Sequence, residues 1–139
     1  MNLSVVVPLL NEEESLHELY ARIDKVCQEN QLSYEIWFVD DGSTDSSWQI
    51  IENLSKENHH VHGIKFSRNY VKSQSLHAAC EKVQGDVVIT MDADLQDFPE
   101  EIPELYNKIV NEKYDLVSGW KKKRFDNVMT KNLPSKLFN

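Results

Sequence analysis

The sequence is poor in cysteine, with Cys27 and Cys80 as the only two in 139 residues. Two cysteines cannot form the dense disulfide framework of a small secreted domain, and this pair matches no metal-ligand spacing. Both lie within apolar patterns of helical spacing, which predicts buried free thiols. Because 40% of the residues are hydrophobic, the chain can bury one core, and we expect a single folded unit.

Long hydrophobic runs are also absent. The longest apolar stretch, residues 3–10, is interrupted by Ser4 and Pro8 and is far shorter than the roughly 18 residues that a membrane span needs. The first residues contain neither the basic region nor the apolar region of a signal peptide. These absences predict a cytoplasmic location, with the present segment soluble.

Glycine and basic charge are scarce as well. Four glycines and the absence of P-loop, GxGxxG and GxSxG patterns argue against a glycine-cradled phosphate site and a nucleophile elbow. The 15 Lys and Arg residues are outnumbered by 23 Asp and Glu residues, which gives a formal net charge of −8 and argues against a general nucleic-acid binder. A phosphate ligand would therefore have to be held by cations, and an acidic protein usually supplies these as a metal ion.

Hydrophobic periodicity predicts an alternation of strands and helices along most of the chain. Asn11 and Glu14 form a capping-box pattern at the start of the first helix. We expect strands at residues 2–10, 34–39, 61–66, 87–91 and 116–120, and helices at residues 16–27, 48–54, 73–83 and 102–111. This order predicts right-handed βαβ crossovers and a mostly parallel, doubly wound α/β sheet.

The pattern ends near residue 120. Residues 121–124 are Lys-Lys-Lys-Arg, and the remainder to Asn139 contains little that could form a strand. We therefore divide the chain into a core of residues 1–120 and a basic segment of residues 121–139, and expect it to be an excerpt of a longer protein. The basic cluster is either a solvated or disordered stretch, or a group that could neutralise a nucleotide diphosphate or meet anionic lipid headgroups.

Polar and acidic side chains follow the first, second and fourth predicted strands. They are Asn11, Glu12, Asp40, Asp41, Asp92, Asp94, Gln96 and Asp97. Ligands of parallel α/β sheets bind beyond the carboxyl ends of strands, so these loops should meet at one edge. Asp92 and Asp94, two residues apart in an extended segment, could share Mg²⁺ or Mn²⁺, although a solvated acidic turn is an alternative. Asp40 or Asp41 could bind a ribose or base, although Ser43 or Thr44 could simply cap the next helix.

Cationic and imidazole groups are ambiguous in the sequence alone. Lys72, in the segment before the third predicted helix, is either solvated or a contact to a substrate phosphate. His59, His60 and His62 surround the start of a strand with no carboxylate or cysteine at useful spacing. We therefore expect these histidines to be solvent-exposed rather than metal ligands.

Four segments resemble the family 2 glycosyltransferases with a GT-A fold. They are VVVPLLNEEES at 5–15, VDDGSTDSS at 39–47, FSRNYVKS at 66–73 and MDADLQDFPEEIPEL at 91–105. The last is similar to the branch that uses polyprenyl-phosphate acceptors. The resemblance implies a metal-dependent, inverting hexosyltransferase that moves a sugar from a UDP- or GDP-sugar to undecaprenyl or dolichyl phosphate. It further implies action at the cytoplasmic side of the cell membrane, reached through segments beyond residue 139.

The resemblance also implies roles for individual residues. The expected nucleotide-binding residues are Pro8, Leu9, Asn11, Glu12, Asp40, Asp41, Lys72, Asp92 and Ala93. The expected metal-binding residues are Asp92, Asp94 and Gln96, with Mg²⁺ or Mn²⁺ as the cofactor. The expected catalytic residues are Asp92, Asp94, Lys121 and Arg124.

Three rival functions remain open at this point. A relative that transfers to a glycan hydroxyl would need a carboxylate base, whereas a lipid phosphate is already ionised and needs none. A nucleotidyltransferase commonly has a glycine-rich loop near its N-terminus, which this sequence lacks. A nucleotide-binding module without turnover would share the acidic edge but not the reaction.

Overall fold

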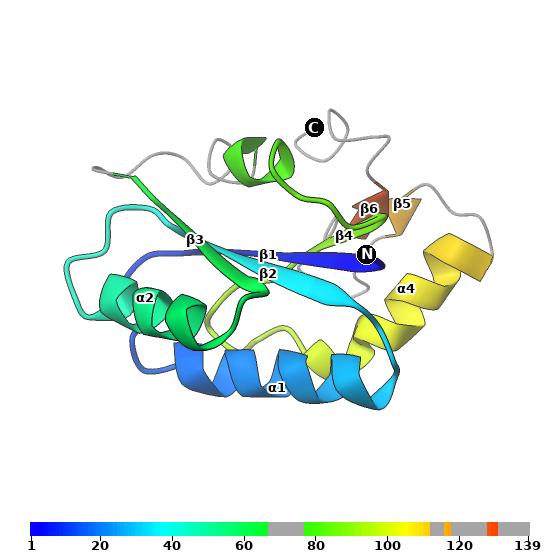
Figure 1. Cartoon of the computed structure of the whole chain (residues 1–139), viewed down its shortest axis with the longest axis horizontal. Helices are drawn as coiled ribbons and strands as arrows, with labels where there is room; N and C mark the ends of the chain where they lie inside the picture. Colours follow the sequence, from blue (N-terminus) through cyan, green and yellow to red (C-terminus); the bar gives the residue numbers. More distant parts are fainter. Residues whose placement is uncertain (67–76, 112–115, 118–127, 131–139) are drawn as a thin grey trace.

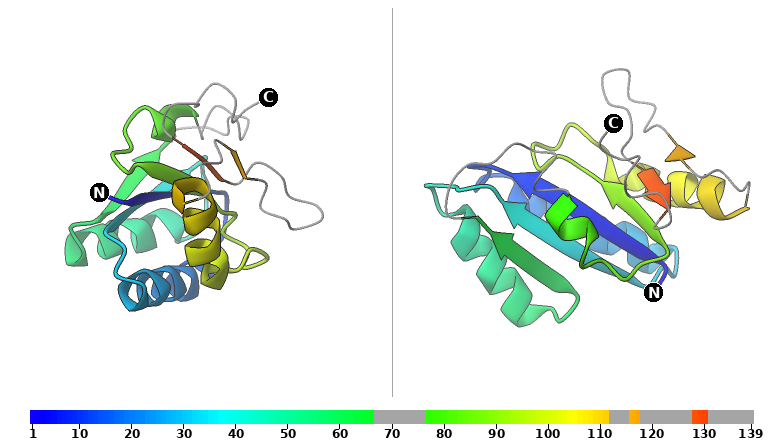
Figure 2. Two further views of the ribbon diagram at one scale, coloured as in Figure 1. Left: turned by 90° about the vertical axis from the view of Figure 1, so that its right-hand side faces the viewer. Right: turned by 90° about the horizontal axis from the view of Figure 1, so that it is seen from above.

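The computed structural model describes residues 1–66, 77–111, 116–117 and 128–130. Figure 1 shows a twisted sheet with three helices, α1, α2 and α4, lying along one of its faces. The short helical stretch of residues 77–80 lies on the opposite face, as the turned views confirm (Figure 2). This arrangement is the α/β sandwich that the alternating sequence pattern predicts.

The sheet has six strands in the order β3-β2-β1-β4-β6-β5. The strands are β1 Leu3–Leu9, β2 Tyr34–Asp40, β3 Val61–Lys65, β4 Val87–Thr90, β5 Leu116–Val117 and β6 Val128–Thr130. The helices are α1 Leu16–Glu29, α2 Ser47–Glu57 and α4 Ile102–Asn111, with the short 3₁₀ helix η1 Pro99–Glu101 before α4. Strands β1 to β4 pair in parallel, whereas β6 is antiparallel to both β4 and β5. The prediction of a mostly parallel sheet is confirmed.

Strand β1 is central, yet it contains a proline. Pro8 pairs with Val39 of β2, while the pairing of β1 with β4 ends at Val6 and Thr90. The backbone groups of alternate residues point to the same neighbour, and the amide of Met91 donates to the carbonyl of Val6 on the β4 side. The nitrogen of Pro8, which carries no hydrogen, therefore points to the β4 side, where the pairing with β4 has already ended. The proline thus removes no hydrogen bond from the sheet.

The larger part of the core lies between the sheet and the three helices. Phe38 of β2 and Leu19 and Ile23 of α1 are fully buried there. A smaller cluster covers the other face, where Ala79 and Val83 pack with β1, β2 and β4. Cys27 is buried in the larger cluster as a free thiol, as predicted, and burial raises its pKa to about 12. Cys80 is also a free thiol, but it is only half-buried beside the smaller cluster, contrary to the prediction.

Several predicted boundaries are wrong. The N-cap of α1 is Ser15 rather than Asn11, because Asn11 lies in a loop that hydrogen-bonds the neighbouring loop. The third predicted helix ends at Cys80 instead of Val83, and its residues 73–76 lie outside the described part.

The C-terminal prediction is also wrong in part. Residues 128–130 form β6, because the open side of β4 offers a backbone ladder to this short segment. Of the predicted strand at 116–120, residues 116–117 form β5 and the rest lie outside the described residues. The division of the chain at residue 120 stays a prediction. No helix among the described residues combines the length and apolar character that a membrane crossing requires.

Candidate functional site

A pocket of about 270 Å³ opens at the carboxyl ends of β1, β2 and β4. It is lined by Pro8, Leu9, Leu10, Glu12, Asp41, Asp92, Ala93 and Asp94. Seven of these eight residues were predicted as site residues from the sequence, and they come from the end of β1 and from the loops after β1, β2 and β4, which are far apart along the chain. The parallel register of the three strands brings the loops together, as expected for an α/β sheet.

The loop after β1 is joined to the loop after β2 by reciprocal hydrogen bonds, which we call the cross-loop bonds. The Asn11 Oδ1 atom accepts the amides of Thr44 at 2.8 Å and Asp45 at 3.2 Å. In return, the Asn11 amide donates to Ser43 Oγ at 2.8 Å, and the Glu12 amide donates to Ser47 Oγ at 2.9 Å. The side chain of Asn11 is thus used to organise the site, and it does not line the pocket.

The backbone of Asn11 has a φ of 54°, in the left-handed region that asparagine tolerates better than most residues. This turn directs the following Glu12 toward the pocket, instead of starting the helix as the capping-box pattern predicted. Glu12 therefore precedes the first turn of α1, and it lines the pocket instead of interacting with the helix dipole.

The two aspartates after β2 have different surroundings. Asp40 is fully buried, and its Oδ1 accepts the amide of Ser43 at 2.8 Å, so it supports the turn beneath the pocket. Asp41 is 8% exposed and lines the pocket itself. Asp41 is therefore the better placed of the two for contact with a nucleoside. Neither Ser43 nor Thr44 caps α2, because the N-cap is Ser46.

The loop after β4 holds Asp92 and Asp94 at the pocket with Ala93 between them. The Asp92 amide donates to Asp97 Oδ2 at 3.0 Å, and Asp94 Oδ1 accepts the Gln96 amide at 3.1 Å. Asp97 is 4% exposed, so it acts as an internal brace of this loop. Gln96 is exposed and is not among the lining residues of the pocket.

Like charges face one another across the pocket. Burial raises the pKa of Glu12, and the nearby carboxylates of Asp94 and Asp45 raise it further. This repulsion between Glu12 and Asp94 would be relieved by a bound cation. Oxygen ligands of this kind fit Mg²⁺ or Mn²⁺, which keep waters and accept further ligands from phosphates.

The described residues do not form a complete metal cage. No group of three or more His, Cys, Asp or Glu side chains within the described ranges is arranged to hold an ion. A carboxylate pair completed by phosphate oxygens is nevertheless the usual arrangement for Mg²⁺. The predicted site residues Lys72, Lys121 and Arg124 lie outside the part that the structure describes.

Sequence reasoning missed the side chains that hold the three loops. Ser43 and Ser47 accept amides of the first loop, and Ser15 donates to the carbonyl of Ala93. Serine and asparagine are ordinary turn residues, so their presence near a helix start carries no sign of a partner in another loop. Only the number of polar residues between each strand and helix hinted at such contacts.

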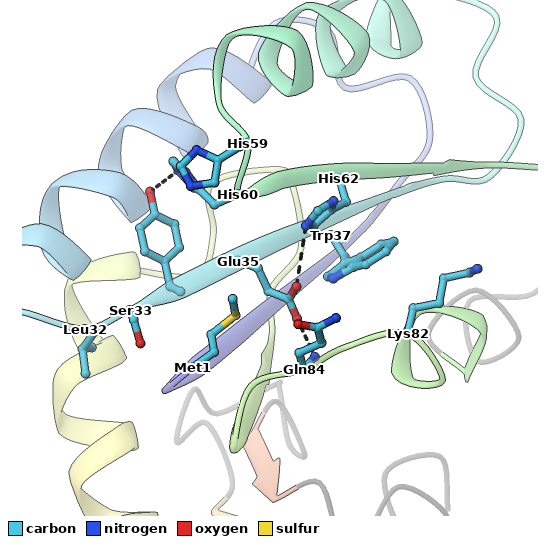
Figure 3. Close-up of a pocket in the computed structure, with 11 residues that line it drawn as sticks. Met1, Leu32, Ser33, Glu35, Trp37, His59, His60, His62, Lys82 and Gln84 are labelled. Atoms are coloured by element: carbon cyan, nitrogen blue, oxygen red, sulfur yellow. Dashed lines mark hydrogen bonds and ion pairs between the residues drawn. The ribbon is translucent and has the colours of Figure 1, made fainter.

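A larger hollow of about 750 Å³ lies at the opposite, amino edge of the strands. Its lining includes Glu35, Trp37, His59, His60 and His62 (Figure 3). Contrary to the prediction of solvent-exposed histidines, His62 stacks on Trp37 with ring centroids 4.5 Å apart, and His60 lies 2.9 Å from the Tyr34 hydroxyl. His59 is exposed as expected.

The carboxylate at this amino edge is hydrogen-bonded. Glu35 is 2% exposed, and its Oε2 accepts the Ser4 hydroxyl at 2.6 Å and the Gln84 amide at 2.7 Å. His62 Nε2 lies 3.6 Å from Glu35 Oε1, and Figure 3 shows the carboxylate between His62 and Gln84. These contacts give the amino edge the character of a structural network rather than of a ligand site.

Comparison with known proteins identifies the family. A sequence model described as glycosyl transferase family 2 matches residues 4–138. The chain is 42% identical, over 137 residues and 98% of its length, to the undecaprenyl-phosphate 4-deoxy-4-formamido-L-arabinose transferase of Klebsiella pneumoniae (strain 342). It spans only 41% of the length of that curated relative.

Solved structures share the fold. Staphylococcus aureus TarS 1-349, determined in complex with UDP-GlcNAc, superposes with a TM-score of 0.69 at 24% identity, covering 85% of this chain and 34% of that one. Glucosyl-3-phosphoglycerate synthase from Mycobacterium tuberculosis, determined with Mn²⁺, UDP and phosphoglyceric acid, gives 0.67 at 24% identity, covering 84% and 42%. The predicted GT-A architecture is confirmed by these neighbours.

Proposed function

The chain belongs to glycosyl transferase family 2, and we propose that it is the donor-binding part of a metal-dependent, inverting glycosyltransferase. Its donor would be a UDP- or GDP-sugar and its acceptor a polyprenyl phosphate. The observation that carries this proposal is the convergence of Asp41, Asp92 and Asp94 on one pocket at the carboxyl edge of the sheet. A nucleoside contact and a carboxylate pair for a diphosphate-bound cation are thereby adjacent.

The lining residues divide the pocket by chemistry. Pro8 and Leu9 offer an apolar surface on which a nucleobase can lie, and Asp41 can accept hydrogen bonds from ribose hydroxyls. Asp92 and Asp94 would hold Mg²⁺ or Mn²⁺, with Gln96 as a further candidate ligand. When bound, the ion would neutralise the charge that develops on the departing nucleoside diphosphate.

The acceptor explains how the reaction can proceed without a dedicated base. A lipid phosphate is ionised near neutral pH, so one of its oxygens can attack the anomeric carbon directly while the bond to the nucleoside diphosphate breaks. The proposed role of Lys72, Lys121 and Arg124 is to stabilise the phosphates. The name of the 42% identical relative supports this acceptor and, because the acceptor is a membrane lipid, action at a membrane surface. Our proposal places this surface on the cytoplasmic side of the cell membrane.

Metal-dependent nucleotide binding is the first test. We expect calorimetry on the full-length protein to detect UDP or GDP binding in the presence of Mn²⁺, and to detect at least a tenfold weaker affinity in Asp94→Asn, because a carboxylate ligand is lost. Asp86→Asn is a matched control, since Asp86 is an exposed aspartate at the other end of β4. Tight binding that chelator and Asp94→Asn leave unchanged would contradict the metal assignment.

Turnover with different acceptors is the second test. The full-length protein, given a panel of nucleotide sugars and a polyprenyl phosphate, should form a lipid-linked monosaccharide. If the protein transfers the sugar only to a glycan hydroxyl, the proposed lipid acceptor is wrong and the rival activity within the family is correct. Nucleotide binding without transfer to either acceptor would favour a binding module.

A further inference from the structure

Ser15 breaks a local rule of helix formation. It is the N-cap residue of α1, a position at which serine ordinarily accepts a hydrogen bond from an amide of the first turn. Here its side chain makes no capping hydrogen bond. Departures from local rules are most often found at functional sites, so the actual partner of this hydroxyl is informative.

The hydroxyl of Ser15 reaches the loop after β4. Its Oγ lies 2.5 Å from the carbonyl oxygen of Ala93, to which it donates, although 78 residues separate the two in the chain. A second acceptor, the carbonyl of Glu12, is farther away at 3.2 Å. Ser15 is 9% exposed and Ala93 is 2% exposed, so the hydrogen bond is shielded from water. The accepting carbonyl belongs to the residue between Asp92 and Asp94.

Ser15 is itself firmly placed. Its amide donates to the carbonyl of Glu12 at 3.1 Å, and its carbonyl accepts the amide of Leu19 at 3.0 Å in the first turn of α1. Leu16 and Leu19 are fully buried against the sheet. The hydroxyl therefore extends from a packed helix end toward the loop after β4 that holds Asp92 and Asp94, which we call the acidic loop.

The acidic loop has a conformation that benefits from such support. Leu95 has a φ of 67°, which is strained for a residue with a branched side chain. The loop bonds donated by the amides of Asp92 and Gln96 end on the carboxylates of Asp97 and Asp94, and Asp94 is itself an expected metal ligand. The Ser15 contact comes from outside the loop and does not involve a carboxylate.

We propose that Ser15 is a positioning residue for the Asp92 and Asp94 pair. By fixing the peptide between the two aspartates, it presets the separation of their carboxylates and reduces the rearrangement that metal and diphosphate binding would require. The inference rests on the proposed function in assigning a metal to this pair. The hydrogen bond and its effect on the loop can be measured without metal.

Three variants of the full-length protein test the role. Ser15→Ala removes the hydroxyl, and Ser15→Thr keeps one. Ser46→Ala is the matched control, because Ser46 is the exposed N-cap of α2 and also makes no capping hydrogen bond through its side chain. Should Ser15→Ala fail to fold, Ser15→Cys, which keeps the size of the side chain but donates only weakly, takes its place.

The first readout is hydrogen exchange of the Asp92 and Gln96 amides in metal-free protein. We expect roughly three- to tenfold faster exchange in Ser15→Ala, the effect of one lost hydrogen bond, with wild-type rates in Ser15→Thr and Ser46→Ala. The second readout is Mn²⁺ affinity in the presence of UDP or GDP, which should weaken by a similar factor in Ser15→Ala and recover in Ser15→Thr.

Wild-type exchange and wild-type Mn²⁺ affinity in Ser15→Ala would overturn the positioning role. An equal effect of Ser46→Ala would also overturn it, because the effect would then belong to any N-cap serine. If the wild-type protein binds no Mn²⁺ with nucleotide, the proposed function fails. The exchange rates still decide whether Ser15 fixes the loop, so the two failures are distinguishable.

Discussion

The two edges of the sheet place their carboxylates in opposite surroundings. At the amino edge, Glu35 is hydrogen-bonded to Ser4 and Gln84 and lies near His62. At the carboxyl edge, Glu12 and Asp94 face each other across the pocket, and the pKa of Glu12 is raised by burial and by Asp94. The larger hollow is at the amino edge, yet the repulsion between carboxylates is at the smaller pocket. Charge repulsion, rather than volume, distinguishes the candidate site.

The largest effect on stability is expected at the amino edge. Glu35→Ala leaves the Ser4 hydroxyl and the Gln84 amide without their buried acceptor, and should lower the free energy of unfolding by about 2–4 kcal/mol. Urea denaturation measures this loss, and Glu104→Ala on the exposed side of α4 is the control. The affinity of the folded protein for the nucleotide sugar should not change. A loss of donor affinity without a loss of stability would break the distinction between the two edges.

An intermediate effect is expected at the cross-loop bonds. Asn11→Gly keeps the left-handed backbone but removes the acceptor for Thr44 and Asp45, so we expect a loss of about 1 kcal/mol. Asn11→Ala adds the backbone penalty and should cost about 2 kcal/mol. Asn11→Asp keeps an acceptor oxygen and should be close to wild type.

Donor kinetics sharpen this second prediction. If the cross-loop bonds place Glu12 and Asp41 at the pocket, Asn11→Gly should raise the KM for the nucleotide sugar more than it lowers kcat. Steady-state kinetics of the full-length protein measures both. Equal KM values in Asn11→Gly and wild type would show that the loops keep their positions without these bonds.

The smallest effect is expected from His60. Its pKa is lowered by burial, although Asp24 opposes this shift, so the unfolded chain takes up a proton at a higher pH than the folded protein does. The contribution of His60 to the free energy of unfolding should be fully present above about pH 6.5, the ordinary histidine pKa. It should fall as the pH drops below this value. His60→Gln should reduce this slope in urea denaturation between pH 7 and 5, whereas His59→Gln, at an exposed position, should not. An identical slope in His60→Gln would assign the acid sensitivity to other groups.

The sequence was most informative where one chemical pattern repeats along the chain. Apolar strands followed by helices predicted the parallel sheet, and acids at the strand ends predicted the pocket of Glu12, Asp41, Asp92 and Asp94. The prediction was weakest where a residue type has several local uses. Asn11 resembled a helix cap, and its actual partners, Thr44 and Asp45, are more than thirty residues away.

The histidines show the same limit. Their polar surroundings in the sequence predicted exposure, but Glu35, which lies 3.6 Å from His62, is on a neighbouring strand. The β3 and β2 register brings these two side chains together, and no spacing within one segment could indicate it. The short strand β6 was missed for a related reason, since it depends on the free side of β4.

The sequence by itself determined the layers of the fold, the edge of the sheet that carries the candidate site and the carboxylates at that edge, because these follow from hydrophobic periodicity and from the order of strands and loops. Only the tertiary structure decided which polar side chains line the candidate pocket and which hydrogen-bond within the protein. Asp41 lines the pocket while Asp40 supports the turn below it, and Ser15 bonds the carbonyl of Ala93 instead of capping its own helix. Hydrogen-bond partners depend on distances between segments, and those distances exist only after the chain has folded.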